Sequence, residues 1–472
     1  MATFGNPTLH VDDQFYSLVG QQMHQGMLPY VDIWDRKPFG LFLLYYAIAA
    51  VSSEPLAYQI AAWLAASTTG CVVYCMSRYW SSGRGAVFAG LIYIAFLHIS
   101  GGEGGQAPVF YNLPVAIAVL ALVRWLAQAP AQPDRNVWLA MGLLGVALTI
   151  KQTVIFEAAA LGTCVLWQLL RTGSGPLAII RTAIASAMLG AGPTLLCFAF
   201  LALAGHFEVF WHAMFSSNLH KEYPDIYVMG ARALLAVLAT TPLMVPFALS
   251  FIGQTGPIAR FRWLLMTWLL AAVVGVVSVP NFYLHYFLPL WLPVAVLSSP
   301  ALDRRCFGPF LALVCLAYSA LIANPFNFAW TQRSRQEVAA ASAMINQLDH
   351  GDSLLVFEGP LVLYRTTGRH FLSPLIFPTH LAWRQELNVS HLDTNRELRR
   401  ILSQRPDVIV TNPRPRSKPA NQEGWRLVED YVRTNCLWHR ETVISEIYRS
   451  WRTDVYGGCR GVRLRTTPKI RT

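Results

Sequence analysis

The sequence predicts an α-helical polytopic membrane protein that carries a small soluble α/β domain at its carboxyl end. The chain is 54% hydrophobic and only 13% charged, whereas about a quarter of the residues of a soluble protein are charged. The charges are also unevenly placed, because residues 1–330 hold 27 of them and residues 331–472 hold 36. The first part is therefore too apolar to face water, and the second part is too polar to lie in lipid.

Most of the net charge of +11 comes from the carboxyl-terminal part. A basic domain can attract anionic headgroups or an anionic substrate. No run of Lys and Arg alternates with aromatic residues, so we do not expect nucleic acid as a partner. The eight cysteines show no metal-ligand spacing, and Cys436 and Cys459 could pair only if their domain lies outside the cytoplasm.

Ten segments are apolar enough to be membrane helices, each of which needs about 20 mostly apolar residues to cross the hydrocarbon core. They cover approximately 56–79, 84–100, 107–126, 137–150, 153–170, 181–204, 232–252, 261–279, 283–299 and 306–323. Residues 38–53 (PFGLFLLYYAIAAVSS) are also apolar, but counting them as a crossing would invert every later loop. We interpret them as a juxtamembrane or re-entrant helix, with a true crossing as the alternative.

Basic residues lie in every second connection between these segments, which is the pattern of cytoplasmic loops. The five basic connections hold Arg78 and Arg84, Arg124 and Arg135, Arg171 and Arg181, Arg260 and Arg262, and Arg304 and Arg305. The residues expected outside are then 1–55, the Glu103 loop, the 205–231 loop and the carboxyl-terminal domain. This predicts a multi-pass membrane protein whose carboxyl-terminal domain lies outside the cytoplasm. An even number of spans that begins outside also predicts a further span before the first residue.

Four regions follow from these patterns. We expect an external loop with a juxtamembrane helix over 1–55, a transmembrane domain over 56–325, an extracytoplasmic α/β domain over 331–456, and a basic disordered tail over 457–472. In the α/β domain, helical stretches alternate with the short apolar strands in DSLLVFEG and PDVIVTN, which predicts a parallel pair. We expect this domain to cap a membrane cavity or to hold an acceptor.

The amino-terminal external segment concentrates carboxylates beside two cations. It holds Asp12, Asp13, Asp32, Asp35, Arg36 and Lys37. On a helix, Asp12 and Tyr16 would share a face, since they are four residues apart. Such carboxylates either belong to a solvated loop or act as a general base near a lipid-borne substrate. In the second case Lys37 would meet a phosphate, because a cation stabilises the charge that grows on a leaving group.

Several short motifs resemble the GT-C membrane glycosyltransferases, in particular the bacterial relatives of dolichyl-phosphate-mannose–protein mannosyltransferases and the lipid A aminoarabinose transferases. The first external loop of that family is similar to Asp12-Asp13-x-x-Tyr16, the Gly-x-x-Pro-Tyr turn at 26–30 and Asp35-Arg36-Lys37-Pro38. The run His285-Tyr286-Phe287-Leu288-Pro289 resembles its His-Tyr-x-x-Pro signature.

The resemblance implies an inverting transfer of a sugar from a polyprenyl-phosphate carrier to an extracytoplasmic protein, lipid or glycan. It matches Asp12 to the family's catalytic carboxylate, which would act as a base on the acceptor, and Lys37 to the lysine that contacts the lipid phosphate. Asp13, at a position that is often Glu in the family, is the second catalytic candidate. The chain departs from the family's pattern at Arg36, where the aminoarabinose transferases carry an acid, and at Phe39, which replaces a second proline. Both departures bear on the identity of the donor sugar.

Other external residues are weaker candidates. We expect Arg36 and Arg232 to add to the phosphate site, and Tyr16, Glu103, His285 and Tyr286 to line the substrate cavity.

Several of these residues have a second interpretation. Glu103, within GGEGGQAP, could equally be a solvated acid in a flexible turn, and His285 could be a packed interfacial residue. Lys151 fits either a functional cation or one that only reaches the headgroups, and Lys221 fits a solvated loop. No set of oxygen ligands indicates a divalent ion, so no cofactor is expected.

The main alternative function is that of a multi-span transporter or flippase of lipids or glycans. Transporters are typically built from internal repeats with broken helices at the bilayer midplane. The sequence shows no internal repeat, and its polar residues gather at the outer face. A lipid-glycan polymerase or ligase would favour a long late external loop, which is absent, and a scaffold without catalysis is the remaining alternative.

Overall fold

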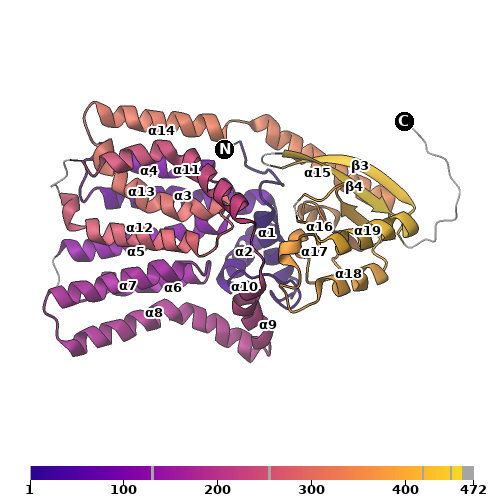
Figure 1. Cartoon of the computed structure of the whole chain (residues 1–472), viewed down its shortest axis with the longest axis horizontal. Helices are drawn as coiled ribbons and strands as arrows, with labels where there is room; N and C mark the ends of the chain where they lie inside the picture. The colour runs from indigo at the N-terminus through magenta and orange to yellow at the C-terminus, as the bar shows by residue number, and fades with distance from the viewer. Residues whose placement is uncertain (1, 129–131, 253–256, 417–418, 447–448, 460–472) are drawn as a thin grey trace.

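The computed structural model describes residues 2–128, 132–252, 257–416, 419–446 and 449–459. Within these residues the protein has three parts (Figure 1): a helical bundle, a middle layer of short helices, and an α/β domain. The middle layer separates the other two, and the amino-terminal segment that carries Asp12 forms part of it. The predicted fold class is confirmed.

Within the described residues, each of the ten predicted spans corresponds to one helix of the bundle. These are α3 (Pro55–Ser77), α4 (Gly83–Ile99), α5 (Ala107–Ala127), α6 (Arg135–Leu148), α7 (Val154–Arg171), α8 (Pro176–Leu203), α11 (Ile226–Leu249), α12 (Arg262–Val277), α13 (Leu288–Leu302) and α14 (Phe307–Ala323). Seven helical stretches in this part of the chain are long and apolar enough to cross a membrane, and α4, α6 and α12 are shorter apolar helices.

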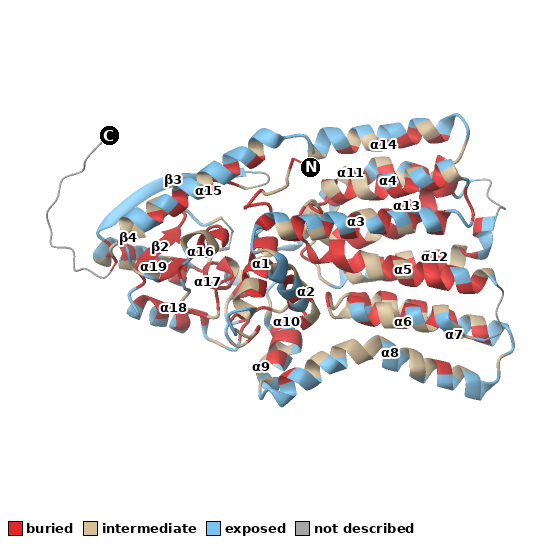
Figure 2. Cartoon of the chain, turned by 180° about the vertical axis from the view of Figure 1, so that it is seen from behind, coloured by how far each residue is buried: buried red, intermediate tan, exposed pale blue. Residues whose placement is uncertain are grey.

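The bundle has a closed centre and an apolar outer surface. Helices α5 and α13 are mostly buried, whereas α8 is exposed along almost its whole length (Figure 2). Its exposed side chains include Leu195, Leu196 and Leu203. A helix that is apolar on its exposed faces is stable against lipid and not against water.

The basic connections lie at the bundle end away from the α/β domain (Figure 1), and two of their arginines cap helix ends. Arg260 donates to the carbonyl of Leu126 at the carboxyl end of α5, and Arg304 donates to the carbonyls of Leu249 and Ile252 where α11 ends. Cations at this position satisfy free carbonyls and complement the helix dipole.

Two short helices of the middle layer hold the amino-terminal segment in place. They are α1 (Val11–Met23) and α2 (Phe39–Val51). Helix α2 covers most of the apolar stretch 38–53; its 13 residues extend only about 20 Å, less than the roughly 30 Å of a hydrocarbon core. It packs closely on α1, because a Cβ at Gly20 would lie 2.5 Å from the carbonyl oxygen of Tyr45.

The remaining helices of the middle layer belong to the loop between α8 and α11. They are α9 (Phe207–Trp211) and α10 (Ser217–His220), joined by a π-helical turn over His212–Ser216. Three short 3-10 helices lie in other parts of the chain: Pro257–Arg260 before α12, Leu284–Phe287 before α13, and Arg384–Glu386 in the α/β domain. Segments predicted to share one side of the membrane do meet: Thr8 of the amino-terminal segment hydrogen-bonds Ser334 and the carbonyl of Ser445.

The α/β domain is built on a four-stranded sheet of order β1-β2-β4-β3. Its elements are α15 (Phe328–Leu348), β1 (Leu354–Val356), α16 (Val362–Thr367), α17 (Pro378–Ala382), α18 (Thr394–Ser403), β2 (Val408–Thr411), α19 (Gln422–Asn435), β3 (Trp438–Glu446) and β4 (Arg449–Gly457). Strands β1 and β2 are parallel, with Leu355 opposite Ile409, which confirms the predicted pair. They are buried throughout, as parallel strands usually are.

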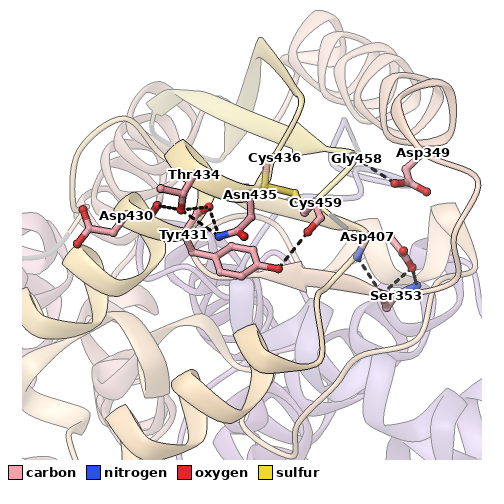
Figure 3. Close-up of a disulfide and its surroundings, with 10 residues drawn as sticks. All are labelled: Asp349, Ser353, Asp407, Asp430, Tyr431, Thr434, Asn435, Cys436, Gly458 and Cys459. Carbon is pink, nitrogen blue, oxygen red and sulfur yellow. Dashed lines mark hydrogen bonds between the residues drawn. A yellow bond between two sulfur atoms is a disulfide. The ribbon is translucent and has the colours of Figure 1, made fainter. Parts of the chain in front are cut away.

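The antiparallel strands β3 and β4 correct the predicted boundary at residue 457. Gly457 is the last residue of β4 and pairs with Val408. Two residues later, Cys459 forms a disulfide with Cys436 after α19 (Figure 3). The carbonyl of Cys459 also accepts a hydrogen bond from the Tyr431 hydroxyl. The domain therefore continues to Cys459, and the rest of the predicted tail, 460–472, lies outside the described residues.

Helices α14 and α15 are separated by a short break in the helical conformation. Asn324 caps α14 in the left-handed region, with a φ of 42°, a conformation that asparagine adopts more readily than most residues. The backbone N–H of Ala2 donates to the carbonyl of Pro325 beside it. The covalent connection between the bundle and the α/β domain thus runs through a bent segment against which the amino terminus packs.

Removing the disulfide should weaken the α/β domain. Replacing both Cys436 and Cys459 by Ser frees a loop of about 23 residues, which should cost about 3 kcal/mol. Limited proteolysis of the full chain in detergent should then cleave the carboxyl-terminal domain faster. The matched control is the replacement of Cys71 and Cys75, exposed on α3, by Ser. Equal resistance of both double variants would contradict the expectation.

Candidate functional site

A cavity of about 300 Å³ lies where the bundle, the amino-terminal segment and the α/β domain meet. Its wall is unusually rich in charged side chains for a site at the end of a membrane bundle. The charged and histidine side chains that line it are His10, Asp12, Asp35, Arg36, Lys37, Lys151, Glu157, Lys221, His285, His380 and Glu386. Of the site residues predicted from sequence, the cavity brings together Asp12, Tyr16, Arg36, Lys37, His285 and Tyr286.

Asp12 faces the cavity from the first turn of α1. Tyr16, one turn further on, lines the same wall, as the four-residue spacing predicts. Asp12 lies 3.9 Å from the Lys37 ammonium and accepts a hydrogen bond from the Gln106 amide at 3.5 Å. Burial opposes ionisation of Asp12, but Lys37 and weaker neighbouring charges outweigh it and hold the pKa of Asp12 below its usual range. The carboxylate is thus kept charged and able to accept a proton.

Lys37 is positioned by the turn that precedes it. The Tyr30 hydroxyl donates to the Lys37 carbonyl at 2.8 Å, and the Asp35 carboxylate accepts from the Lys37 backbone N–H at 2.9 Å. Tyr30 itself has a φ of 75°, a costly conformation for a bulky residue. The Lys37 ammonium lies 3.6 Å from Asp35 and 5.5 Å from the centre of the Tyr16 ring. It therefore stands between two carboxylates over an aromatic face.

Asp13 points away from the cavity, although it follows Asp12 directly. It accepts a hydrogen bond from the backbone N–H of Gly105 at 2.8 Å. A Cβ at Gly104 would lie 2.0 Å from the Asp13 carboxylate, and a Cβ at Gly105 would lie 2.0 Å from the Tyr45 hydroxyl. The glycines beside Glu103 thus allow the loop to approach α1 and α2. Burial raises the pKa of Asp13 to about 7, although His10 opposes the rise.

Arg36 and Lys221 share one carboxylate from the α/β domain. Arg36 donates to both oxygens of Glu386, at 2.8 and 2.7 Å, and the Lys221 ammonium lies 3.1 Å from the same group. Burial alone would raise the pKa of Glu386, but Arg36 and then Lys221 lower it to about 2. The charge of Arg36 is therefore committed to Glu386 in this structure.

Lys151 lines the cavity between α6 and α7, with its ammonium 5.2 Å from the centre of the Tyr286 ring. In the part of the chain that the structure describes, no carboxylate lies within 4 Å of it. Burial, followed by repulsion from Lys37, lowers the pKa of Lys151 to about 7. An anion in the cavity would relieve both effects, so Lys151 is well placed to bind one.

Besides Asp13, two other predicted site residues, Glu103 and Arg232, lie outside the cavity wall. Glu103 approaches His10 at 3.6 Å. Arg232, in the second turn of α11, lies over the Tyr283 ring at 4.4 Å and donates to the Asn281 carbonyl at 3.1 Å. Arg232 therefore supports the wall of the cavity from behind, through residues that do line it.

Sequence patterns did not predict the contribution of the α/β domain to the cavity. Its segment between α17 and the 3-10 helix places Thr379, His380, Trp383 and Glu386 in the wall. Burial lowers the pKa of His380 to about 4, so this ring is neutral at physiological pH. The Glu386 partner Lys221 fitted an ordinary loop cation in the sequence, and only the structure shows that both groups are buried together.

A possible metal-binding group lies elsewhere. In the described ranges, His439, Glu441 and Asp454 of the β3–β4 hairpin are the one group of three such side chains close enough to share an ion. None of them lines the cavity.

Comparison with solved structures identifies the fold. The chain is similar to ArnT from Cupriavidus metallidurans in the apo state, with a TM-score of 0.61 and 13% identity over 98% of this chain and 96% of that one. The chain has the GT-C fold. ArnT from the same organism bound to undecaprenyl phosphate matches with a TM-score of 0.60 and 13% identity, over 99% and 96% of the two chains.

The oligosaccharyltransferase of Archaeoglobus fulgidus in the apo form matches more weakly, with a TM-score of 0.45 and 10% identity over 86% of this chain and 66% of that one. No protein-family model matches the sequence, and the comparison with curated proteins finds no significant match. The likeness to ArnT therefore establishes the GT-C architecture of the bundle and its attached domain.

Replacing Glu386 by Gln should destabilise the contact between the three parts. Two buried cations lose their carboxylate, at a cost of about 3 kcal/mol, which should appear as a lower midpoint of thermal unfolding in detergent. The matched control is Glu222→Gln, since Glu222 forms an exposed pair with Arg384, which contributes little. Because the pKa of Glu386 is lowered from 4.5 to about 2, the extra stability should be present above pH 4.5 and lost as the pH falls towards 2. Equal midpoints for the two variants would contradict this expectation.

Anion binding in the cavity should weaken as the pH rises above about 7. Lys151 must be protonated to bind an anion, so each unit of pH above its pKa should cost up to tenfold in affinity. Dioctyl phosphate is a suitable probe, because a phosphodiester keeps its charge in this range. In Lys151→Met the affinity should be lower at pH 6 and the dependence on pH much flatter. The same steep dependence in the variant would show that another group is responsible.

Proposed function

We propose that this protein is an inverting glycosyltransferase, which moves a sugar from a polyprenyl-phosphate carrier to a hydroxyl of an extracytoplasmic protein, lipid or glycan. One observation carries the proposal: a charged carboxylate, Asp12, stands 3.9 Å from the ammonium of Lys37 in a cavity at the end of a membrane bundle. A base for the acceptor beside a cation for the leaving phosphate is the minimal arrangement for this reaction.

The residues divide the reaction between them. Asp12 takes the proton of the acceptor hydroxyl as its oxygen forms a bond to the anomeric carbon of the sugar. On the opposite face, the bond from that carbon to the phosphate oxygen breaks, and the electron pair leaves with the polyprenyl phosphate. Lys37 and Lys151 stabilise the growing negative charge. The scheme needs no cofactor, because two cations match the charge of the leaving group.

The roles of three predicted residues change accordingly. Asp13 supports the position of α1 through Gly105 and not the chemistry. Arg36 is engaged by Glu386, and Arg232 lies behind the wall, so Lys151 replaces both as the second phosphate ligand. Undecaprenyl phosphate, which ArnT binds in a solved structure of the same fold, is the carrier type that this arrangement suits.

The proposed site faces the periplasm of a bacterium, with the bundle in the inner membrane. Two observations support this orientation. The basic connections lie at the bundle end away from the α/β domain, and basic loops stay in the cytoplasm. The α/β domain contains the disulfide between Cys436 and Cys459, a bond that persists in oxidising compartments.

A transporter is the alternative, and the position of the charges argues against it. Transport sites lie near the bilayer midplane between repeated halves. Here Asp12 and Lys37 come from the segment outside the bundle, and the α/β domain closes over them through Glu386. A charged cavity at the membrane surface, lined by both the bundle and the α/β domain, suits a reaction between a lipid-borne donor and an external acceptor.

Asp12→Asn should abolish most of the transfer activity. Loss of a general base typically costs 10²- to 10⁴-fold, so we expect a fall of about a thousandfold in kcat. The assay would use radiolabelled polyprenyl-phosphate sugars with membranes that contain the acceptor. Asp32→Asn is the control, because Asp32 lies exposed in the same segment and an amide oxygen can still accept from the Leu28 N–H. Undiminished transfer by Asp12→Asn would remove Asp12 from the mechanism.

A further inference from the structure

A carboxylate inside the membrane bundle forms part of the floor of the cavity. Glu157 lies three residues into α7, about 4.5 Å along the helix axis from its start. Its exposed fraction is 4%, and it lines the same cavity as Asp12. The indole N–H of Trp268, on α12, donates to one of its oxygens at 2.8 Å. The proposed mechanism gives this residue no role.

Glu157 has no cation to balance it. Among the described residues, no Lys, Arg or His lies within 4 Å of its carboxylate. An ionisable group in a membrane helix is costly and therefore usually functional. A carboxyl group has about four acceptor positions, and Trp268 uses one of them. The carboxyl of Glu157 can therefore accept further hydrogen bonds from a molecule in the cavity.

The surroundings of Glu157 are polar and leave space. Tyr111 of α5 and Thr153 before α7 line the same region, and so do the small residues Ala272 and Gly275 of α12. A polyprenyl chain would gain nothing from a carboxyl group and two hydroxyls, since buried polar groups need partners. This floor suits an occupant rich in hydroxyl groups.

The cations fix where such an occupant would lie. Lys37 lies 3.9 Å from Asp12, and Lys151 lines the same cavity, so a phosphate bound by these cations holds its sugar in the space that Asp12 and Glu157 both line. The anomeric carbon would lie towards Asp12, and the far side of the ring would extend towards Glu157. We propose that Glu157, together with Tyr111 and Thr153, forms hydrogen bonds with the hydroxyls of the donor sugar and so selects the donor. This inference rests on the proposed function.

The test compares carriers with and without a sugar on the full chain in nanodiscs. One probe is undecaprenyl phosphate without a sugar. The other is the same carrier bearing mannose, glucose or a 4-amino-pentose, and the sugar that binds the wild-type chain most tightly is chosen for the comparison. Glu157→Gln keeps the shape and an acceptor for Trp268. We expect it to weaken the sugar-bearing carrier up to about tenfold, the usual scale of one lost hydrogen bond, and to leave undecaprenyl phosphate within twofold.

Trp268→Phe separates this role from a purely structural one. It removes the indole donor and keeps the Glu157 carboxylate, so a structural role for the pair predicts that both variants weaken both carriers alike. That result, or an unchanged affinity of Glu157→Gln for the sugar-bearing carrier, would overturn the inference. If Glu157→Gln fails to fold, Tyr111→Phe and Thr153→Val test the same ratio of affinities, and an unchanged ratio in both overturns it.

The two proposals fail differently. If the wild-type chain binds neither carrier, or if Asp12→Asn transfers sugar normally, the proposed function is wrong. If the wild-type chain binds both carriers and transfers sugar, but Glu157→Gln binds them as the wild type does, only the assignment of the sugar subsite is wrong.

Discussion

The candidate site depends on the attraction between Asp12 and Lys37. A carboxylate that leaves water loses its solvation and tends to bind a proton, and a protonated Asp12 could not act as a base. The ammonium of Lys37 outweighs that tendency, and Asp35 in turn keeps Lys37 charged from its other side. The strained turn around Tyr30 holds Lys37 in the position where its ammonium faces Asp12.

The α/β domain completes the cavity partly through electrostatics. Glu386 brings one negative charge to two cations that belong to different segments, Arg36 of the amino-terminal loop and Lys221 of the loop before α11. Without that carboxylate, both cations would compete with Lys37 and Lys151 for any anion. The domain therefore decides which of the four cations remain open to a ligand.

Local relations in the sequence predicted local parts of the site well. The ten spans and the parallel pair follow from hydrophobic patterns, and the shared wall of Asp12 and Tyr16 follows from helical spacing. Contacts between distant segments could not be predicted in this way. Nothing near Glu386 marks it as the partner of Arg36, some 350 residues earlier, and Lys221 resembled an ordinary loop cation for the same reason.

Other differences have equally specific causes. Arg232 stands at the predicted end of its span, but its side chain lies over the Tyr283 ring and not in the cavity. The direction of a side chain at a helix end depends on tertiary packing, which the sequence pattern does not show. The glycines around Glu103 suggested room for a ligand, whereas the structure uses them to bring backbone against Asp13 and Tyr45. Strands β3 and β4 escaped notice because most of β3 is exposed and polar, so no apolar alternation marks it.

The left-handed residue Asn324 gives the molecule a natural pivot. The chain passes from bundle to domain only there, and the amino terminus packs beside it, so the two parts are joined tightly along one edge. Across the cavity they are held by Glu386 and its two cations. The α/β domain also contacts the amino-terminal segment directly, because the Trp34 backbone N–H donates to the Pro374 carbonyl and Arg365 pairs with Glu54. Its position over the cavity is therefore shared among several separate segments, so a change in any one of them reaches the chamber.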